Sequence, residues 1–128
     1  MHHVEALHTD GAPAAIGPYS QACVAGGFLS SAGQIGLDPS MGQLVGPGLR
    51  EQAYRVFENL AAVLAAAGAG FGDVVKTTVF VADMSDFAEL NAIYAEHFTE
   101  PFPARSTVEA GALPAGARVE IDVVARLP

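Results

Sequence analysis

The stretch at residues 74–82 limits the possible folds most, because it is a β-strand pattern with two apolar faces. One face carries Val75, Thr77, Val79 and Val81, and the other carries Val74, Lys76, Thr78, Phe80 and Ala82. Side chains of a strand alternate between the faces of its sheet, so this sheet needs cover on both sides. We expect helices on one face and other copies of the chain, in a closed homo-oligomer, on the second.

Two helices are predicted. Residues 50–67 place apolar side chains at spacings of three and four, and Gly68 and Gly70 then end the pattern. The second helix covers residues 86–98, opened by a capping box of Asp86 and Glu89. Two helices are too few to cover both faces of a sheet, so they should pack on the same face.

Strands are predicted on either side of these helices. Residues 16–25 and 28–35 form a hairpin around Gly26-Gly27, and residues 105–110 and 118–125 form a closing hairpin around residues 113–116. The turn-rich stretch 37–48 is expected to be a surface loop. The order ββ-α-β-α-ββ predicts an α+β fold in one domain over residues 1–128.

Composition excludes several kinds of partner. The net charge is −8, with a single lysine and five scattered arginines, so a nucleic acid or an anionic membrane surface is disfavoured. No apolar run is long enough to span a bilayer. The single Cys23 cannot form an intramolecular disulfide, which is typical of a reducing compartment, and we expect a cytoplasmic protein.

No metal or phosphate motif is recognisable. The chain has no Walker loop, and its glycine-rich stretch at 68–72 ends a helix instead of opening one. Its histidines are His2, His3 and His8 near the start and His97 in the second helix, which does not predict converging metal ligands. Lys76 either forms a Schiff base, if desolvated, or reaches solvent from its strand.

Two segments could carry chemistry. In the first, Pro101 and Pro103 restrain the backbone before Arg105, which suits either the bidentate recognition of a carboxylate or a salt bridge. In the second, Glu120 and Asp122 alternate with apolar residues and share one face of a strand. If that face is also the face of Arg105, a guanidinium and a carboxylate converge; otherwise Glu120 lies on an ordinary solvent face.

The sequence resembles the RidA family, also called YjgF, Rid or endoribonuclease L-PSP, over about residues 12–125. The matching stretches begin with residues 14–22 (AAIGPYSQA), 33–35 (GQI) and 58–60 (ENL). They continue with 73–80 (DVVKTTVF), Asn91 with Tyr94, 103–106 (PARS) and 119–121 (VEI). Each stretch is short, but their order and spacing are specific to the family.

The resemblance implies a chorismate-mutase-like α+β subunit with a mixed sheet and two helices on one face. It also implies a homotrimer, whose sheets form a central barrel and whose active sites lie between subunits. The implied activity is hydrolysis of reactive 2-imino acids and enamines, such as 2-aminoacrylate released by pyridoxal-phosphate enzymes, to 2-keto acids and ammonia. The resemblance implies no metal and no organic cofactor.

The resemblance also assigns roles to residues. Arg105 binds the substrate carboxylate, Glu120 orients or activates the attacking water, and Tyr19 lines the pocket. Asn91, the backbone at Gly33, and Thr107 complete the implied binding site. Two positions depart from the family pattern, since Thr107 stands where many members have Cys and Ala32 where a Ser is common; both bear on substrate preference and rate.

Two other functions stay open at this point. A non-catalytic module that binds 2-keto acids or similar metabolites would use the same arginine. A ribonuclease or translation inhibitor, as one family name suggests, is disfavoured by the acidic composition.

Overall fold

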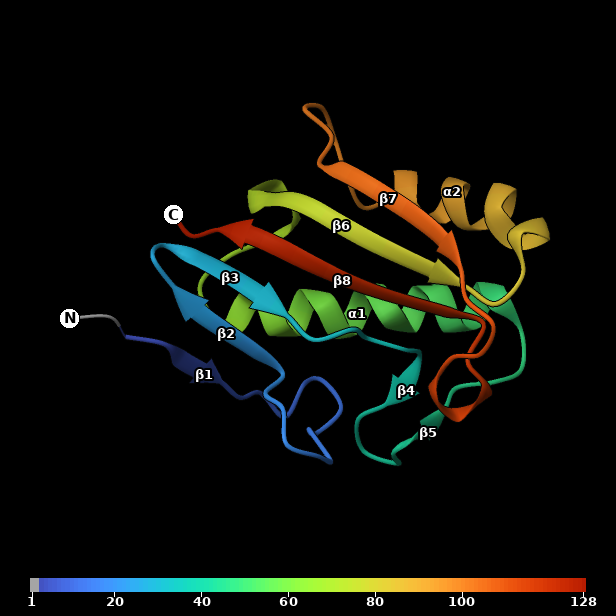
Figure 1. Ribbon diagram of the computed structural model, residues 1–128, viewed down its shortest axis with the longest axis horizontal. Helices are drawn as coiled ribbons and strands as arrows, with labels where there is room; N and C mark the ends of the chain where they lie inside the picture. Colours follow the sequence, from blue (N-terminus) through green and yellow to red (C-terminus); the bar gives the residue numbers. More distant parts are fainter. Residues whose placement is uncertain (1–2) are drawn as a thin grey trace.

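The computed structural model describes residues 3–128, so His2 lies outside the described residues. Figure 1 shows the helices beside one large sheet. The helices are α1 (Leu49–Ala66) and α2 (Phe87–Ala95), and the short 3-10 turns are η1 (Phe71–Asp73), η2 (Met84–Asp86) and η3 (Pro114–Gly116). The strands are β1 (Glu5–Leu7), β2 (Ala22–Ala25), β3 (Phe28–Ser31), β4 (Leu37–Asp38), β5 (Gln43–Leu44), β6 (Val74–Val81), β7 (Ala104–Glu109) and β8 (Val119–Arg126).

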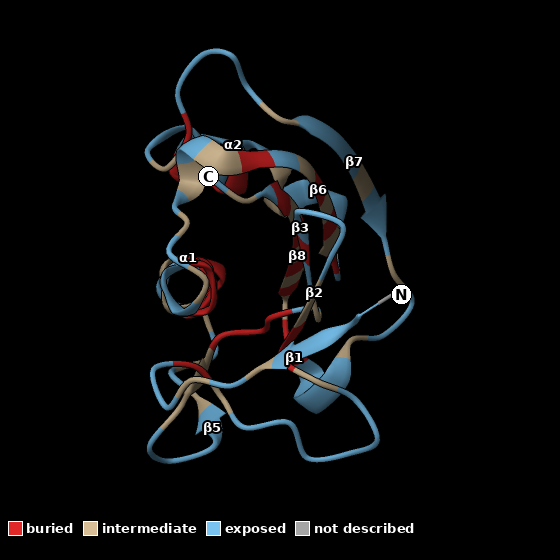
Figure 2. Ribbon diagram, turned by 90° about the vertical axis from the view of Figure 1, so that its left-hand side faces the viewer, coloured by how far each residue is buried: buried red, intermediate tan, exposed pale blue. Residues whose placement is uncertain are grey.

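The large sheet has six strands in the order β1-β2-β3-β8-β6-β7. The β6–β7 pair is parallel and the other neighbours are antiparallel, so the sheet is mixed. Both helices lie on the same side of the sheet (Figure 2). The predicted α+β class, mixed sheet and one-sided helices are therefore confirmed.

Helix α1 forms within one residue of its predicted bounds. Its apolar stripe, which includes Phe57, Leu60 and Leu64, is buried against the sheet. At the start, the carboxylate of Glu51 accepts a hydrogen bond from the backbone N–H of Gly48 at 2.8 Å. At the end, Gly68 adopts a left-handed φ of 73°, which glycine tolerates best.

Helix α2 is shorter than predicted, and the predicted capping box is wrong. Asp83 caps the preceding η2 turn instead, because its carboxylate accepts a hydrogen bond from the Ser85 N–H. The carboxylate of Asp86 accepts hydrogen bonds from the guanidinium of Arg118 at 2.7 and 3.1 Å. A long-range ion pair thus replaces the local cap.

The N-terminal hairpin turns at Gly26-Gly27 as predicted, with φ angles of 59° and 82°. Its strands are shorter than expected, and residues 16–21 form a loop on which Ile16 is 90% exposed. Two features were missed: β1 pairs with β2, and the stretch predicted as a loop contains the β4–β5 pair. Strands of two or three residues are too short to display an alternation.

The predicted closing hairpin is wrong. Strand β7 pairs in parallel with β6, while β8 inserts between β3 and β6. An apolar alternation identifies a strand but not its partner, and the chain between β7 and β8 is long enough to cross the end of β6. The observed register sets Arg105 opposite Thr77 and Glu120 opposite Phe80.

A β-bulge modifies the two predicted faces of β6. The pairing with β8 is irregular between Val74 and Lys76, so Val74 is buried under the helices and Val75 is 45% exposed. From Lys76 onward the alternation is regular, and Thr77, Val79 and Val81 are buried on the helix side. The face that was predicted to carry Val75 with Thr77, Val79 and Val81 therefore carries Val74 in its place.

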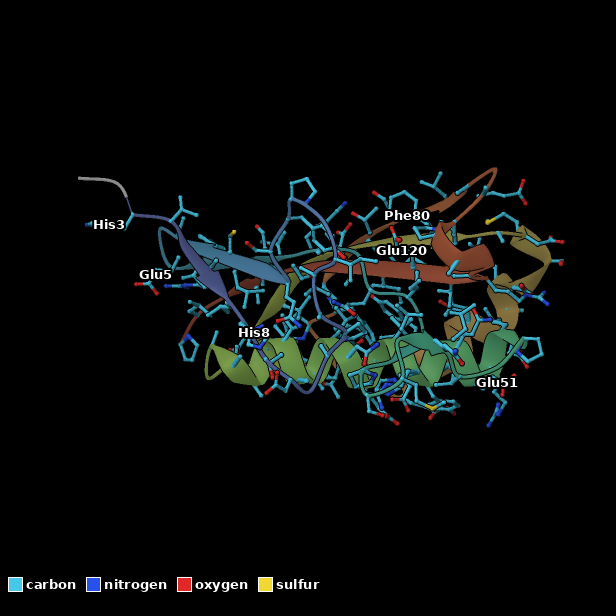
Figure 3. The ribbon with its side chains drawn as sticks, turned by 90° about the horizontal axis from the view of Figure 1, so that it is seen from below. His3, Glu5, His8, Glu51, Phe80 and Glu120 are labelled. Atoms are coloured by element: carbon cyan, nitrogen blue, oxygen red, sulfur yellow. The ribbon has the colours of Figure 1, made fainter. Side chains whose placement is uncertain are left out.

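The face of the sheet away from the helices, here called the outer face, remains partly apolar. Phe28 and Val108 are 44% and 46% exposed on it, and Cys23 is half-buried there. In Figure 3, Phe80 and Glu120 lie on the side of β8 away from α1. Across residues 3–128, neither helix has the length and apolar character needed to cross a membrane.

Candidate functional site

Arg105 lies at the start of the edge strand β7 and points toward α2. Its guanidinium donates a hydrogen bond from Nη1 to Oδ1 of Asn91 at 2.8 Å. Its Cζ lies 4.7 Å from the ring centroid of Tyr94 and 5.3 Å from that of Phe87. Among residues 3–128, Asn91 is the only hydrogen-bond partner of this guanidinium, so four of its five N–H groups stay available.

A shallow depression of about 440 Å³ surrounds this guanidinium. Its lining consists of Asn91, Tyr94, Ala95, Phe102, Pro103 and Arg105. Phe102 is 57% exposed at its rim. The depression therefore offers one fixed positive charge beside aromatic surface, which suits a small carboxylate with an apolar part.

Glu120 lies in a second depression, of about 380 Å³, formed by the loops that precede β2 and follow β3. Tyr19 and Gly33 line the same depression, and Tyr19 is 53% exposed. Burial raises the pKa of the Glu120 carboxyl, and the negative charge of Asp122 raises it further. A carboxyl with a raised pKa accepts a proton more readily than an exposed one does, which favours a role in proton transfer.

The backbone of Gly33 packs directly against the Glu120 side chain. A Cβ at this position would lie 2.6 Å from Oε2 and 2.7 Å from Cδ of Glu120. No residue with a side chain fits there without displacing the carboxylate. Glycine is therefore needed at position 33 to make room for the Glu120 side chain. It is not needed for its backbone conformation, since its φ lies outside the left-handed region.

The loop that carries Tyr19 is fixed by the buried side chain of Gln21. Its Oε1 accepts a hydrogen bond from the Thr9 N–H at 2.7 Å. Its Nε2 lies within hydrogen-bond distance of the carbonyl oxygens of Thr9, Ala12 and Pro13. One glutamine thus ties residues 9–13 to the start of β2.

The two depressions lie on opposite faces of the sheet. Arg105 shares the helix side with its partner Thr77, whereas Glu120 and its partner Phe80 lie on the outer face. The register separates the Cα atoms of Arg105 and Glu120 by two strands and three residues, or about 14 Å. The two predicted functional groups therefore do not converge within one chain.

The predicted site residues accordingly divide into two groups. Asn91 joins Arg105, and Tyr19 and Gly33 join Glu120. Thr107 lies two residues beyond Arg105 on the same face of β7 and is half-buried there. The structure therefore divides the predicted site residues between two separate regions of the chain.

Other candidate groups have ordinary structural surroundings. Lys76 reaches the outer face, where its Nζ donates a hydrogen bond to Oγ of Ser106 at 3.0 Å. The ring of His97 stacks on Phe57 with a centroid distance of 4.1 Å. Within the described part of the chain, no three His, Cys, Asp or Glu side chains gather as metal ligands would.

Sequence reasoning assigned no role to three residues that surround Arg105. Phe87 counted only as a member of an apolar helical stripe, Tyr94 as a member of that stripe and as a position that matches the family, and Phe102 only as part of the segment around the prolines. Phe87, Asn91 and Tyr94 are spaced i, i+4 and i+7, so they share one face of a helix. That spacing beside an arginine-bearing strand was the available signal, but it could not specify which strand the helix covers.

The fold and the two depressions are those of a small α+β protein with an exposed arginine beside aromatic side chains and a partly buried carboxyl of raised pKa. The family model described as Endoribonuclease L-PSP matches residues 9–127. The chain belongs to this family, and the predicted resemblance is confirmed.

Relatives and solved structures agree with this assignment. The human 2-iminobutanoate/2-iminopropanoate deaminase is 49% identical over 119 residues, covering 93% of this chain and 87% of that protein. The crystal structure of RidA from an Antarctic Psychrobacter is 44% identical, with a TM-score of 0.92 over 96% of this chain and 99% of that one. The crystal structure of Escherichia coli TdcF with bound serine is 36% identical, with a TM-score of 0.90 over 97% and 99%.

Proposed function

We propose that this protein hydrolyses small 2-imino acids to 2-keto acids and ammonia, in a site that two copies of the chain form together. The observation that carries the proposal is the separation of Arg105 and Glu120 onto opposite faces of the sheet. Deaminase function is supported by the human relative, which bears that name and matches nearly the full chain. The bound serine of the TdcF structure, a small amino acid with a carboxylate, is consistent with the same class of ligand.

The outer face supplies the reason for assembly. Its exposed apolar side chains, including Phe28 and Val108, would be covered by the sheet of another copy. Such packing brings the Glu120 depression of one copy toward the β7 edge of its neighbour. A head-to-tail contact gives a ring where the rotation between copies closes, and we propose the homotrimer that the resemblance implies.

Arg105 provides substrate binding in this mechanism. The carboxylate of the imino acid accepts hydrogen bonds from the guanidinium N–H groups that Asn91 leaves available. This contact fixes the position of the electrophilic carbon C2, which is bonded to the carboxylate carbon and carries the imine nitrogen. Because the free imine is already reactive, orientation beside a water molecule contributes much of the rate.

Glu120 of the neighbouring copy moves the protons. As a carboxylate it accepts a proton from water while the water oxygen bonds to C2, which gives a tetrahedral carbinolamine. The same proton then passes to nitrogen. Glu120 next carries the hydroxyl proton of the carbinolamine to nitrogen, so that the C–N bond breaks and ammonia leaves as the C2–oxygen double bond forms. Because its pKa is raised, the Glu120 carboxyl accepts a proton more readily than an exposed glutamate does, which favours this role. Tyr19 and the Gly33 backbone line the same depression as Glu120, and Thr107 lies on the strand of Arg105.

Imine hydrolysis can be followed by coupling the protein to a threonine dehydratase. The dehydratase releases 2-iminobutanoate, and the appearance of 2-oxobutanoate is measured in the presence of semicarbazide, which traps free imine. We expect the wild-type protein to accelerate keto-acid formation and Arg105→Ala to abolish that acceleration without losing the fold. Wild-type rates in Arg105→Ala would contradict carboxylate binding by this residue.

Subunit mixing tests the shared site. Arg105→Ala and Glu120→Ala chains, each inactive alone, are co-expressed with different affinity tags and the mixed oligomers are isolated. Every mixed trimer has an intact Arg105 and an intact Glu120 together at one of its three interfaces, so about a third of the wild-type activity should return. If both residues served one site from the same chain, no activity would return.

The alternatives give distinct outcomes in these assays. Binding of 2-oxobutanoate without turnover would identify a metabolite-binding module that uses the same arginine. Cleavage of labelled RNA by a nuclease-free preparation would support the ribonuclease function in the family description, although the net charge of −8 disfavours it. A cytoplasmic location, expected from the single cysteine, belongs to the same proposal.

A further inference from the structure

Arg105 lies near the start of the edge strand β7, and residues from one face of α2 contact its side chain. Phe87, Asn91 and Tyr94 follow one another along α2 at the i, i+4 and i+7 spacing of a single helix face. The two rings contact the guanidinium at 5.3 and 4.7 Å, and the amide between them accepts its hydrogen bond. Three residues of one helix therefore hold one arginine.

Aromatic rings are suited to hold an arginine without blocking its donors. The guanidinium is planar, and its five N–H groups lie in that plane, whereas rings contact its π faces. A carboxylate that competed for the same N–H groups would neutralise the charge and occupy the edge needed for substrate. An aromatic contact restrains the group and leaves its hydrogen-bonding edge free.

Tyr94 is itself fixed from the sheet. Its hydroxyl and the Thr77 hydroxyl form a hydrogen bond at 2.9 Å in a fully buried position. Thr77 is also the residue directly opposite Arg105 in the β6–β7 ladder. The strand that sets the backbone of Arg105 thus also sets the ring against which its side chain rests.

We propose that Phe87 and Tyr94, the latter held by Thr77, are positioning residues that fix the guanidinium of Arg105 for carboxylate binding. Because they act through the guanidinium, they affect substrate affinity and not the hydrolysis step. This inference rests on the proposed function for its kinetic consequence. In the free protein, independently of any activity, the Arg105 side chain should already be ordered before a ligand binds.

The test compares ring-removing with ring-retaining variants. Phe87 is half-buried, so substituting it endangers the fold less than substituting the buried Tyr94. Phe87→Leu and Phe87→Tyr therefore form the main pair, with Tyr94→Leu and Tyr94→Phe as the second. Tyr54→Leu is the matched control, because Arg50 lies 5.2 Å from the Tyr54 ring in a similar pair on α1. Each variant is assayed with 2-iminobutanoate from the dehydratase, and 2-oxobutanoate binding is measured by calorimetry.

We expect Phe87→Leu and Tyr94→Leu to raise KM and the Kd for 2-oxobutanoate roughly 5–10-fold with kcat nearly unchanged. Phe87→Tyr and Tyr94→Phe should restore values close to wild type, and Tyr54→Leu should leave both constants unchanged. If Phe87→Leu lowers only the unfolding midpoint, or lowers kcat at constant KM, the positioning role is wrong. A Tyr94→Leu chain that fails to fold leaves the decision to the Phe87 pair.

A spectroscopic measurement separates this inference from the proposed function. The Nε–H signal of Arg105, identified by its loss in Arg105→Lys, reports rotation of the guanidinium about the Nε–Cζ bond in the ligand-free protein. We expect slow rotation in wild type and faster rotation in Phe87→Leu. If wild type hydrolyses no imine, the proposed function fails, while the Nε–H signal and the Kd comparison still decide the positioning role. Equal rotation in both proteins would overturn it.

Discussion

Replacing Gly33 with alanine should inactivate this protein while leaving its fold intact. The new Cβ would lie 2.6 Å from Oε2 of Glu120, whereas ordinary contacts between such atoms begin near 3.4 Å. The carboxylate must therefore move by about 1 Å. A displacement of that size at a catalytic group costs about 100-fold in rate, equivalent to about 2.7 kcal/mol of activation free energy.

The stability of Gly33→Ala should change far less than its activity. The conflicting atoms belong to the end of a flexible side chain, and the φ of Gly33 is accessible to alanine. We expect the free energy of unfolding to stay within about 1 kcal/mol of wild type. The dehydratase-coupled assay measures the rate, and urea unfolding measures the stability.

Two other glycines provide the controls. At Gly72 a Cβ would meet no atom within 4 Å, so Gly72→Ala should change neither activity nor fold. At Gly36 the Cβ would lie 2.8 Å from backbone atoms of Gln52, so Gly36→Ala should destabilise the protein. Full activity in Gly33→Ala would refute the argument, because it would mean that the position of the Glu120 carboxylate does not limit the rate.

Two further predictions concern the depression that Glu120 and Tyr19 line. Gln21→Ala should lower the free energy of unfolding by about 2–4 kcal/mol, measured in urea, because the loop carrying Tyr19 loses about three part-buried hydrogen bonds; an unchanged urea midpoint would contradict this. Asp122→Asn should shift the acidic limb of the pH profile of kcat/KM to lower pH, because the negative charge of Asp122 raises the pKa of Glu120. A shift to higher pH would refute the assignment of that limb to Glu120.

Much of the secondary structure followed from local pattern. The apolar stripe and the following glycines placed α1 within one residue, and Gly26-Gly27 placed the first hairpin turn. The failures share a cause. Strands β1, β4 and β5 have three residues or fewer, and Asp86 faces a distant arginine instead of its own helix end. In each case the decisive contact, a pairing strand or Arg118, is not encoded in the periodicity of the segment itself.

The candidate site was predictable by residue but not by geometry. The resemblance named Arg105, Asn91, Glu120, Tyr19 and Gly33, and each lines one of the two depressions. That Arg105 and Glu120 lie on opposite faces depends on β8 inserting beside β6, which alternation along a single strand does not encode. The same insertion makes a second copy of the chain necessary for our proposed mechanism.

The sequence by itself determined the α+β class, the family and the identity of the charged groups, because periodicity, composition and short motifs are local properties of the chain. Only the tertiary structure decided which face each group occupies, which rings hold Arg105, and why position 33 must be glycine. These features depend on strand order and register, which bring together side chains from distant segments. A single shift in pairing would have moved Arg105 or Glu120 to the other face without changing any residue.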